Sequence, residues 1–228
     1  MTPPREFERI PLSVRVEFRT ASSFLVAYSV NLSRGGMFLE TSHAPSLGSE
    51  VKLAFTVPGV GAISLSGRVA WRRDEASADL PIGIGIEFSD IDRALGSTID
   101  TLVGRFSGLN LVVYSAAEHD RAQLSRMIRS TIGTADVASA DSVHLTEALL
   151  GDEVDLVIAH ADADIDGALL VVRTAALAKI PVVVVAADAD VRDRAQEAGA
   201  TATSTSPPQQ TELSRIILGA LGRPILVG

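Results

Sequence analysis

The sequence predicts two domains, a six-stranded antiparallel β-barrel followed by an α/β domain with a doubly wound, five-stranded parallel sheet. Three observations predict this fold class. Residues 1–90 contain short segments in which apolar and polar side chains alternate, whereas residues 109–228 alternate continuous apolar runs with amphipathic stretches. The charge is also uneven, with a net charge of −1 over residues 1–106 and −7 over residues 107–228. At 228 residues, the chain is long enough to bury two cores.

Six segments of the first domain read as β-strands. In the first of them, residues 11–20, apolar side chains at Leu12, Val14 and Val16 alternate with polar ones. The other five segments span residues 22–33, 35–42, 50–59, 61–74 and 81–90. Turn residues such as Pro58 separate these segments, and short strands at such spacing are typical of an antiparallel barrel or sandwich.

A connecting helix is expected after the barrel. Apolar residues recur every three or four positions, at Ile91, Leu95, Ile99, Leu102 and Phe106. Such a helix can pack on the barrel, bridge the domains or form a dimer contact. The predicted boundaries are therefore residues 1–90 for the barrel, 91–108 for the helix and 109–228 for the α/β domain.

Five strand–helix units follow. Their predicted strands are residues 109–116, 135–140, 154–161, 180–187 and 200–206. The third and fourth of these strands are continuous apolar runs, which indicates burial on both faces of a parallel sheet.

The composition excludes several classes of function. The chain has no cysteine, so it has no disulfides, thiolate metal sites or cysteine nucleophiles. A net charge of −8 argues against DNA or RNA as a partner, because phosphate-backbone binding relies on clustered lysine and arginine. No apolar run is long enough to span a bilayer. We therefore expect a cytoplasmic protein without membrane insertion.

One turn in the barrel contains unusual chemistry. The segment NLSRGGMF combines the short polar side chains of Asn31 and Ser33 with Arg34 and the adjacent glycines Gly35 and Gly36. The polar side chains can donate and accept hydrogen bonds, and the glycines let a ligand approach the backbone closely. The same residue types also occur in ordinary turns. Taken alone, the segment indicates either a binding loop or a decorated turn.

An arginine pair precedes the first strand, with Arg5 and Arg9 spaced four apart. The pair and the turn together resemble the signatures of the PilZ domain, Arg-x-x-x-Arg and [Asp/Asn]-x-Ser-x-x-Gly. The strands containing GRVAW and PIGIGIEF also fit, so the resemblance covers about residues 1–90. Many members of the family have a further arginine before the first signature arginine, where this chain has Pro4.

The resemblance implies binding of the bacterial second messenger cyclic di-GMP and no catalysis or cofactor. An arginine fork can bond the guanine edge, contact phosphate or stack on a base. The implied binding residues are Arg5, Arg9, Asn31, Ser33, Arg34, Gly35 and Gly36.

The second domain resembles the receiver domain of response regulators but departs from that family at every position of its chemistry. The aligned positions hold Tyr114 and Ser115 for the acidic pair, His160 for the phosphoacceptor aspartate, Ala186 for the hydroxyl residue and Ser206 for the lysine. A receiver needs hard oxygen ligands for Mg²⁺ and a carboxylate nucleophile. We therefore expect a pseudo-receiver that is not phosphorylated and that binds a protein partner or another copy of itself, through a surface within residues 189–221.

One alternative concerns a metal site, and three hypotheses of function remain. Asp162, Asp164 and Asp166 alternate as in a cation-binding loop, but the distal glutamate of an EF-hand is missing, so no metal is expected. The protein is either a cyclic di-GMP effector or a scaffold that keeps the barrel fold and binds proteins only. A third hypothesis is a response regulator controlled by phosphorylation.

Overall fold

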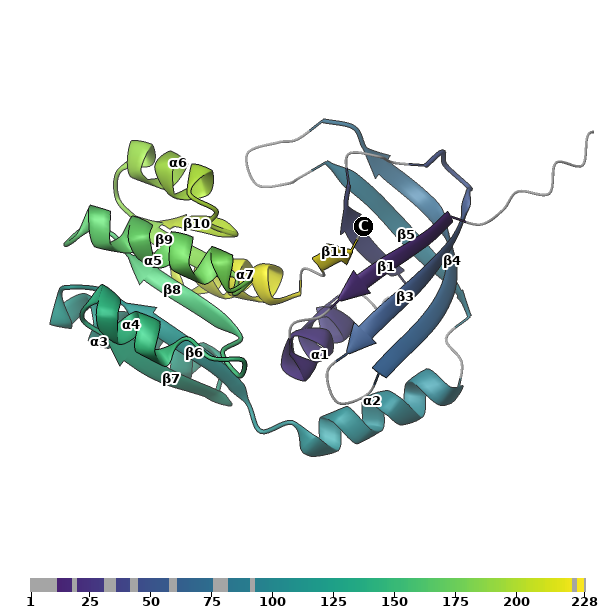
Figure 1. Cartoon of the computed structure of the whole chain (residues 1–228), viewed down its shortest axis with the longest axis horizontal. Helices are drawn as coiled ribbons and strands as arrows, with labels where there is room; N and C mark the ends of the chain where they lie inside the picture. The colour runs from purple at the N-terminus through teal and green to yellow at the C-terminus, as the bar shows by residue number, and fades with distance from the viewer. Residues whose placement is uncertain are drawn as a thin grey trace, which may run out of the picture.

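A computed structural model describes residues 12–17, 20–30, 36–41, 45–57, 61–75, 82–90, 93–222 and 225–227. These residues form two sheets with separate cores, joined along one side by helices (Figure 1). No helix in this described part is long and apolar enough to cross a membrane.

The first sheet has six strands in the order β11-β1-β3-β4-β5-β2. Their bounds are β1 Leu12–Glu17, β2 Gly36–Glu40, β3 Glu50–Val57, β4 Gly61–Arg73, β5 Gly83–Asp90 and β11 Ile225–Val227. Neighbouring strands are antiparallel except β1 and β3, which run parallel. The sheet curls strongly, but among the described residues no pairing joins β11 to β2. The predicted closed, wholly antiparallel barrel is therefore not seen, and the sixth strand comes from the far end of the sequence.

The prediction that residues 22–33 form the second strand is wrong. Most of residues 22–33 lies in the helix α1, Ala21–Val30. The segment is apolar without a strict alternation, and a run of this kind does not distinguish a buried helix from a buried strand. Its environment decides, because Phe24 is fully buried in the core of the first sheet while Val26 is buried in a core of the second.

The core of the first sheet follows the alternation of its strands. In β3 the inward side chains are Val51, Leu53, Phe55 and Val57, all almost completely buried. The helix α2, Arg93–Arg105, adds Leu102 to this core, while Val103 and Phe106 remain exposed. The division of the chain at residues 90 and 108 stays a prediction.

The second sheet confirms the predicted parallel arrangement. Its strands follow the order β10-β9-β8-β6-β7, and every pair is parallel. The bounds are β6 Leu109–Tyr114, β7 Ala135–Ala140, β8 Leu156–His160, β9 Val182–Ala186 and β10 Ala202–Thr205. The helices are α3 Glu118–Thr131, α4 Val143–Leu149, α5 Ile165–Leu177, α6 Ala189–Glu197 and α7 Gln210–Leu221.

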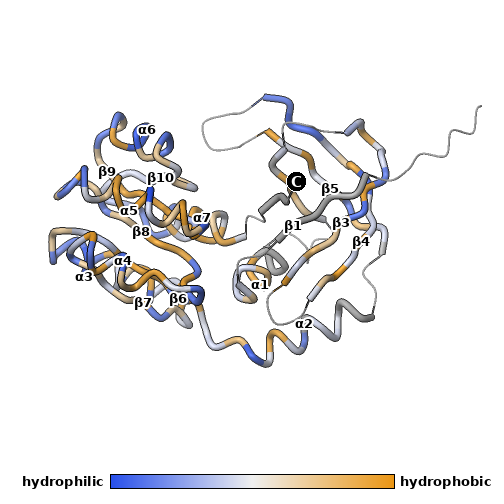
Figure 2. Tube along the Cα trace, viewed as in Figure 1, coloured by the Kyte–Doolittle hydropathy of each residue, from blue (hydrophilic) through white to orange (hydrophobic). Residues whose placement is uncertain are grey.

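Both faces of this sheet are covered by helices, as a doubly wound fold requires. One face packs with the apolar residues of α5 and α6, and the other with those of α3 and α7. Figure 2 shows hydrophobic and hydrophilic residues alternating along these helices, beside strands such as β8 that are mainly hydrophobic. Parallel strands in this order place the carboxyl ends of β6, β8 and β9 along one edge, where sites form in such folds.

Candidate functional site

Most of the predicted ligand-binding residues lie outside the described part of the chain. This applies to Arg5, Arg9, Asn31, Ser33, Arg34 and Gly35. Gly36 is described, as the first residue of β2. The convergence of the arginine pair with the glycine turn therefore stays a prediction.

Gly36 sits where only glycine fits. It lies opposite Glu87 of β5, and a Cβ atom built on it would be 2.5 Å from the carbonyl oxygen of Ile86. A backbone oxygen cannot move aside as a flexible side chain can, so any substitution must separate β2 from β5. The last glycine of the turn thus holds the end of the predicted binding loop against the sheet.

An aromatic platform begins two residues after this glycine. Phe38 lies on the same face of β2 as Gly36, because alternate residues of a strand share a face. Its ring stacks on that of Trp71 from β4, with the centroids 5.3 Å apart and the planes 11° from parallel. The guanidinium carbon of Arg73 lies 5.4 Å from each centroid. We call Phe38, Trp71 and Arg73 the aromatic platform.

Two glycines of β5 make room for the rings. Phe38, Gly85 and Trp71 lie side by side on three neighbouring strands. A Cβ atom on Gly85 would collide with the indole of Trp71, and one on Gly83 would lie 2.5 Å from the Cζ atom of Phe38. The rings therefore lie flat over bare backbone, with Trp71 still 44% exposed.

The sequence pattern predicted these residues only as members of strands, and it did not predict the aromatic platform. The sequence did contain an indication of the platform. In the segment PIGIGIEF, glycines occupy alternate positions of the strand and therefore lie on the same face. Such a face is bare and must be covered by side chains from neighbouring strands or by a ligand.

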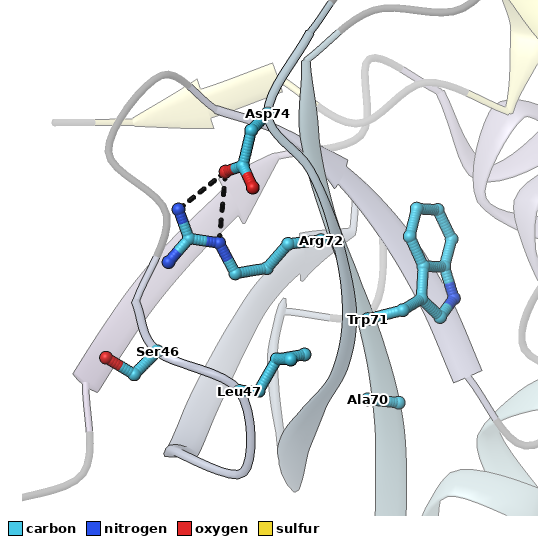
Figure 3. Close-up of a pocket in the computed structure, with 6 residues that line it drawn as sticks. All are labelled: Ser46, Leu47, Ala70, Trp71, Arg72 and Asp74. Atoms are coloured by element: carbon cyan, nitrogen blue, oxygen red, sulfur yellow. Dashed lines mark hydrogen bonds and ion pairs between the residues drawn. The ribbon is translucent and has the colours of Figure 1, made fainter.

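A surface groove of about 550 Å³ lies beside the aromatic platform, lined by Ser46, Leu47, Ala70, Trp71, Arg72 and Asp74 (Figure 3). Arg72 donates two hydrogen bonds to one oxygen of Asp74, at 3.2 Å from Nε and 2.6 Å from Nη2. Figure 3 shows Arg72 turned toward Asp74, while the Trp71 ring projects on the other side of β4. Since the charge of Arg72 is already paired, the groove offers little attraction for an anion.

In the second domain, Tyr114 is a residue that the sequence aligns with the acidic pair of a receiver. It is completely buried at the end of β6, and its hydroxyl donates a 2.8 Å hydrogen bond to Oδ2 of Asp164. Burial raises the pKa of the Tyr114 phenol, and the hydrogen bond and charge of Asp164 raise this pKa further. The position therefore holds a neutral hydrogen-bond donor, which cannot serve as an anionic metal ligand.

His160 closes the same edge at the end of β8. It is 5% exposed, and its Nε2 lies 3.1 Å from the hydroxyl of Ser206. Two carboxylates flank the ring, with Oδ2 of Asp120 3.4 Å from Nδ1 and Oδ2 of Asp162 3.7 Å from Nε2. The structure thus brings together His160 and Ser206, two of the residues aligned with receiver chemistry.

Asp162 is held as a carboxylate. Burial raises its pKa, but the hydrogen bonds from Ser206 and the backbone N–H of Ala187, with the charges of His160 and Arg192, outweigh that effect. The pKa of Asp162 therefore lies below its ordinary value.

Two arginines cover carbonyl groups at this edge, which sequence reasoning also did not predict. Nη1 of Arg192 donates to the carbonyls of Ala186 and Ala187 at 2.7 and 2.8 Å. Nη1 of Arg121 donates to the carbonyl of Ser115 at 2.6 Å and to that of Ala116 at 3.2 Å. Side chains of the protein thus satisfy backbone acceptors at the ends of β6 and β9.

The three alternating aspartates do not converge on one point. Asp162 accepts a hydrogen bond from Ala187 N, Asp164 caps α5 by accepting from Gly167 N, and Asp166 has a side chain 96% exposed. Within the described ranges, no three acidic or histidine residues are arranged to hold a metal ion. The cation-loop alternative gains no support from this geometry.

Residues 3–105 match the family model described as the PilZ domain. The match includes both sequence signatures and reaches to the end of α2. The resemblance inferred from the motifs is confirmed by this match. No curated protein matches the chain.

Solved structures of receiver domains match about half of the chain. A response regulator receiver protein from Pseudoalteromonas atlantica is 18% identical with a TM-score of 0.43, covering 49% of this chain and 96% of its own. A receiver domain protein from Clostridium thermocellum is 16% identical with a TM-score of 0.44, covering 50% and 94%. The receiver domain of a modulated diguanylate cyclase from Desulfovibrio desulfuricans is 17% identical with a TM-score of 0.44, covering 50% and 94%. The receiver-like fold itself follows from the parallel sheet order and its helices.

Proposed function

We propose that this protein is a non-enzymatic receptor for cyclic di-GMP. The observation that carries the proposal is the PilZ match over residues 3–105, which contains both signatures in the expected order. The signature residues supply the chemistry that the ligand requires. Arg5 and Arg9 bind phosphate or guanine edges, while Asn31 and Ser33 add hydrogen bonds beside the open backbone of the glycines.

The aromatic platform extends this site. Its Phe38 lies on the strand that begins with Gly36, on the same face as that glycine, and the exposed indole of Trp71 from β4 stacks on the Phe38 ring. A guanine can stack on Trp71, and Arg73 adds a cation beside both rings. We therefore assign Trp71 and Arg73 to the ligand-binding face, in addition to the signature residues.

The receiver-like domain passes the signal to a protein partner without being phosphorylated. Two observations support the absence of phosphorylation. Tyr114 fills the place of an acidic metal ligand, and His160, buried against Ser206 and Asp120, replaces the nucleophilic aspartate. Labelling with an acyl phosphate in the presence of Mg²⁺ should therefore give no incorporation. Incorporation at Asp162 or Asp164 would show that the domain is an active receiver.

Calorimetric titration with cyclic di-GMP tests the receptor function. Arg9→Ala should weaken binding about tenfold or more, because charge-assisted hydrogen bonds contribute about 1.5–3 kcal/mol. Trp71→Ala should weaken it by about fivefold to a hundredfold, since base–aromatic stacking contributes about 1–3 kcal/mol. Because Trp71 is the single tryptophan of the chain, ligand binding should also change the intrinsic fluorescence.

The matched control is Lys52→Ala. Lys52 is an exposed cation on β3, which β4 and β5 separate from β2. This variant loses one positive charge without touching the site, so its affinity should stay within about twofold of the wild type. Absence of binding in the wild-type protein, under conditions in which it is folded, would refute the receptor function.

The alternative function is a nucleotide-independent scaffold. It is favoured by exposed apolar side chains on the second domain, where Leu145 of α4 and Leu170 and Leu177 of α5 are 40%, 46% and 87% exposed. These residues lie on helices other than those in the predicted surface within residues 189–221. If the scaffold reading is right, the partner is captured equally well from cells with and without the nucleotide.

A further inference from the structure

The helix α1 belongs to both domains. Its Phe24 is completely buried in the core of the first sheet, with Ala21 and Leu25 packed beside it. Its Val26, two residues later, is 8% exposed and lies in the core that the second sheet forms with α3 and α7. The helix packs directly against α7, and Figure 1 shows it between the two sheets. A change in the position of α1 therefore disturbs both cores.

Thr20, the residue that precedes α1, forms a hydrogen bond with the second domain. The hydroxyl of Thr20 accepts a 2.9 Å hydrogen bond from the backbone N–H of Ser23, which is the bond of a helix N-cap. Ser23 returns the interaction by donating to the carbonyl of Thr20 at 2.8 Å. The proton of the Thr20 hydroxyl points to Oδ1 of Asp155 at 2.5 Å. One hydroxyl thus caps the helix and connects it to the other domain.

Asp155 is a buried anchor of the second sheet. It is 2% exposed, and its Oδ2 accepts a hydrogen bond from Asn110 N at 2.8 Å. Its own N–H donates to the carbonyl of Asn110, also at 2.8 Å. Asp155 therefore fixes the start of β6 beside the start of β8, two neighbouring interior strands, while it accepts the bond from Thr20. A buried carboxylate that loses one of its donors is costly, which makes this contact sensitive to the position of α1.

Two further contacts lie at the same junction. The hydroxyl of Ser22 donates to the carbonyl of Gly108 at 3.3 Å, just before β6 begins. The strand β11, which follows α7, pairs with β1 at three positions, from Arg15 opposite Val227 to Glu17 opposite Ile225. Both elements that adjoin the predicted ligand site, α1 and β1, are thus attached to the second domain.

We propose that α1 couples the nucleotide site to the receiver-like domain, with the hydrogen bond from Thr20 to Asp155 as its coupling contact. The inference rests on the proposed receptor function. The helix ends at Val30, and the signature turn starts at Asn31, so a ligand bound by the turn acts directly on the end of α1. The other end of α1 carries the Thr20 hydroxyl. The ligand shifts the second domain only as far as it binds one arrangement of this junction more tightly than another.

Hydrogen–deuterium exchange with and without cyclic di-GMP tests the coupling in the full chain. In the wild type, the ligand should change the exchange of residues 109–114 and 156–160, which are distant in sequence from the site. Thr20→Val removes the hydroxyl at nearly constant volume, and this variant should bind the ligand within about threefold of the wild type without changing exchange in the second domain. Thr20→Ser keeps the hydroxyl and should restore the response.

Ser23→Ala is the control for the reciprocal hydrogen bonds of the capping motif, because it leaves the N-cap bond from the Ser23 N–H to the Thr20 hydroxyl in place. It removes the Ser23 hydroxyl that bonds the backbone of Thr20 but leaves the contact between Thr20 and Asp155 in place. Its response in the second domain should therefore equal that of the wild type. An equal loss in Ser23→Ala and Thr20→Val would mean that the contact between Thr20 and Asp155 does not carry the response, and it would overturn the proposal.

A ligand-free measurement separates this proposal from the receptor function. Thr20→Val, Asp155→Asn and the double variant form a cycle whose thermal unfolding is followed in the absence of nucleotide. Effects that are clearly non-additive support the coupling contact, and additive effects contradict it.

Failure of the wild type to bind cyclic di-GMP would refute the receptor function but not the contact between the domains. Binding without any change of exchange in the second domain would refute the coupling alone.

Discussion

At the scale of single residues, the position of the Trp71 ring depends on Gly85, which has no side chain. Gly85 leaves bare backbone under the indole, and a methyl group there would overlap the ring. Gly85→Ala should therefore push Trp71 off the aromatic platform and lower the free energy of unfolding by about 1–3 kcal/mol. Denaturant unfolding measures the loss, and the emission of the single tryptophan reports the displaced ring.

Gly96→Ala is the matched control for that change. Gly96 lies in α2, and nothing lies within 4 Å of an added Cβ atom. Alanine there should stabilise the protein by about 0.5–1 kcal/mol, because glycine is unfavourable inside a helix. A similar, small effect of both substitutions would contradict the steric role of Gly85.

Asp162 gives a prediction about pH. Its pKa in the folded protein lies below its ordinary value of 3.8, so the carboxylate form stabilises the fold. This contribution is complete above the ordinary pKa and is lost as the pH falls through the lower folded value. The difference in unfolding free energy between wild type and Asp162→Asn should thus be constant near neutral pH and shrink below about pH 4.

Urea unfolding at several pH values measures that difference. Asp166→Asn controls for the loss of one negative charge, since the Asp166 side chain is 96% exposed. A difference between wild type and Asp162→Asn that grows on acidification would contradict the stabilising role of the Asp162 carboxylate.

At the scale of elements, the local sequence pattern predicted the structure correctly where a whole segment packs in a single core or sheet. The strands β8 and β9 are continuous apolar runs because both faces are covered by helices, and the sequence pattern indicated this directly. The strand β3 alternates because only one face is buried. The helix α1 is different, because it contacts two cores at once. Its apolar residues therefore follow neither the 3.6-residue repeat of a helix with one buried face nor the two-residue repeat of a strand.

The candidate site shows the same division between local and non-local information. The signature residues Asn31, Ser33 and Gly36 are close in sequence, so their pattern indicated a binding loop. The aromatic platform was missed because Phe38 and Trp71 are far apart in sequence and meet only through the register of β2, β5 and β4. The bond between Thr20 and Asp155 joins residues even farther apart, and only the folded arrangement of both domains brings them together.

At the scale of the whole molecule, the two domains share a sheet. The last described strand, β11, completes the first sheet after the chain has passed through the entire second domain. The domains are thus joined at α2, at α1 and at β11, in contrast to two domains joined by one linker. Such a shared sheet favours a single cooperative unfolding transition.

Removal of β11 tests this view of the molecule. A variant that ends at Gly222 loses the three pairs between β11 and β1. The lost backbone hydrogen bonds correspond to roughly 2–4 kcal/mol, and the exposed edge of β1 frees the first sheet to unfold independently of the second. Calorimetry should show one transition for the wild type and two for this variant, the first several degrees lower. A variant that lacks only Gly228 should behave as the wild type, and a single unshifted transition after removal of β11 would mean that this strand does not join the domains energetically.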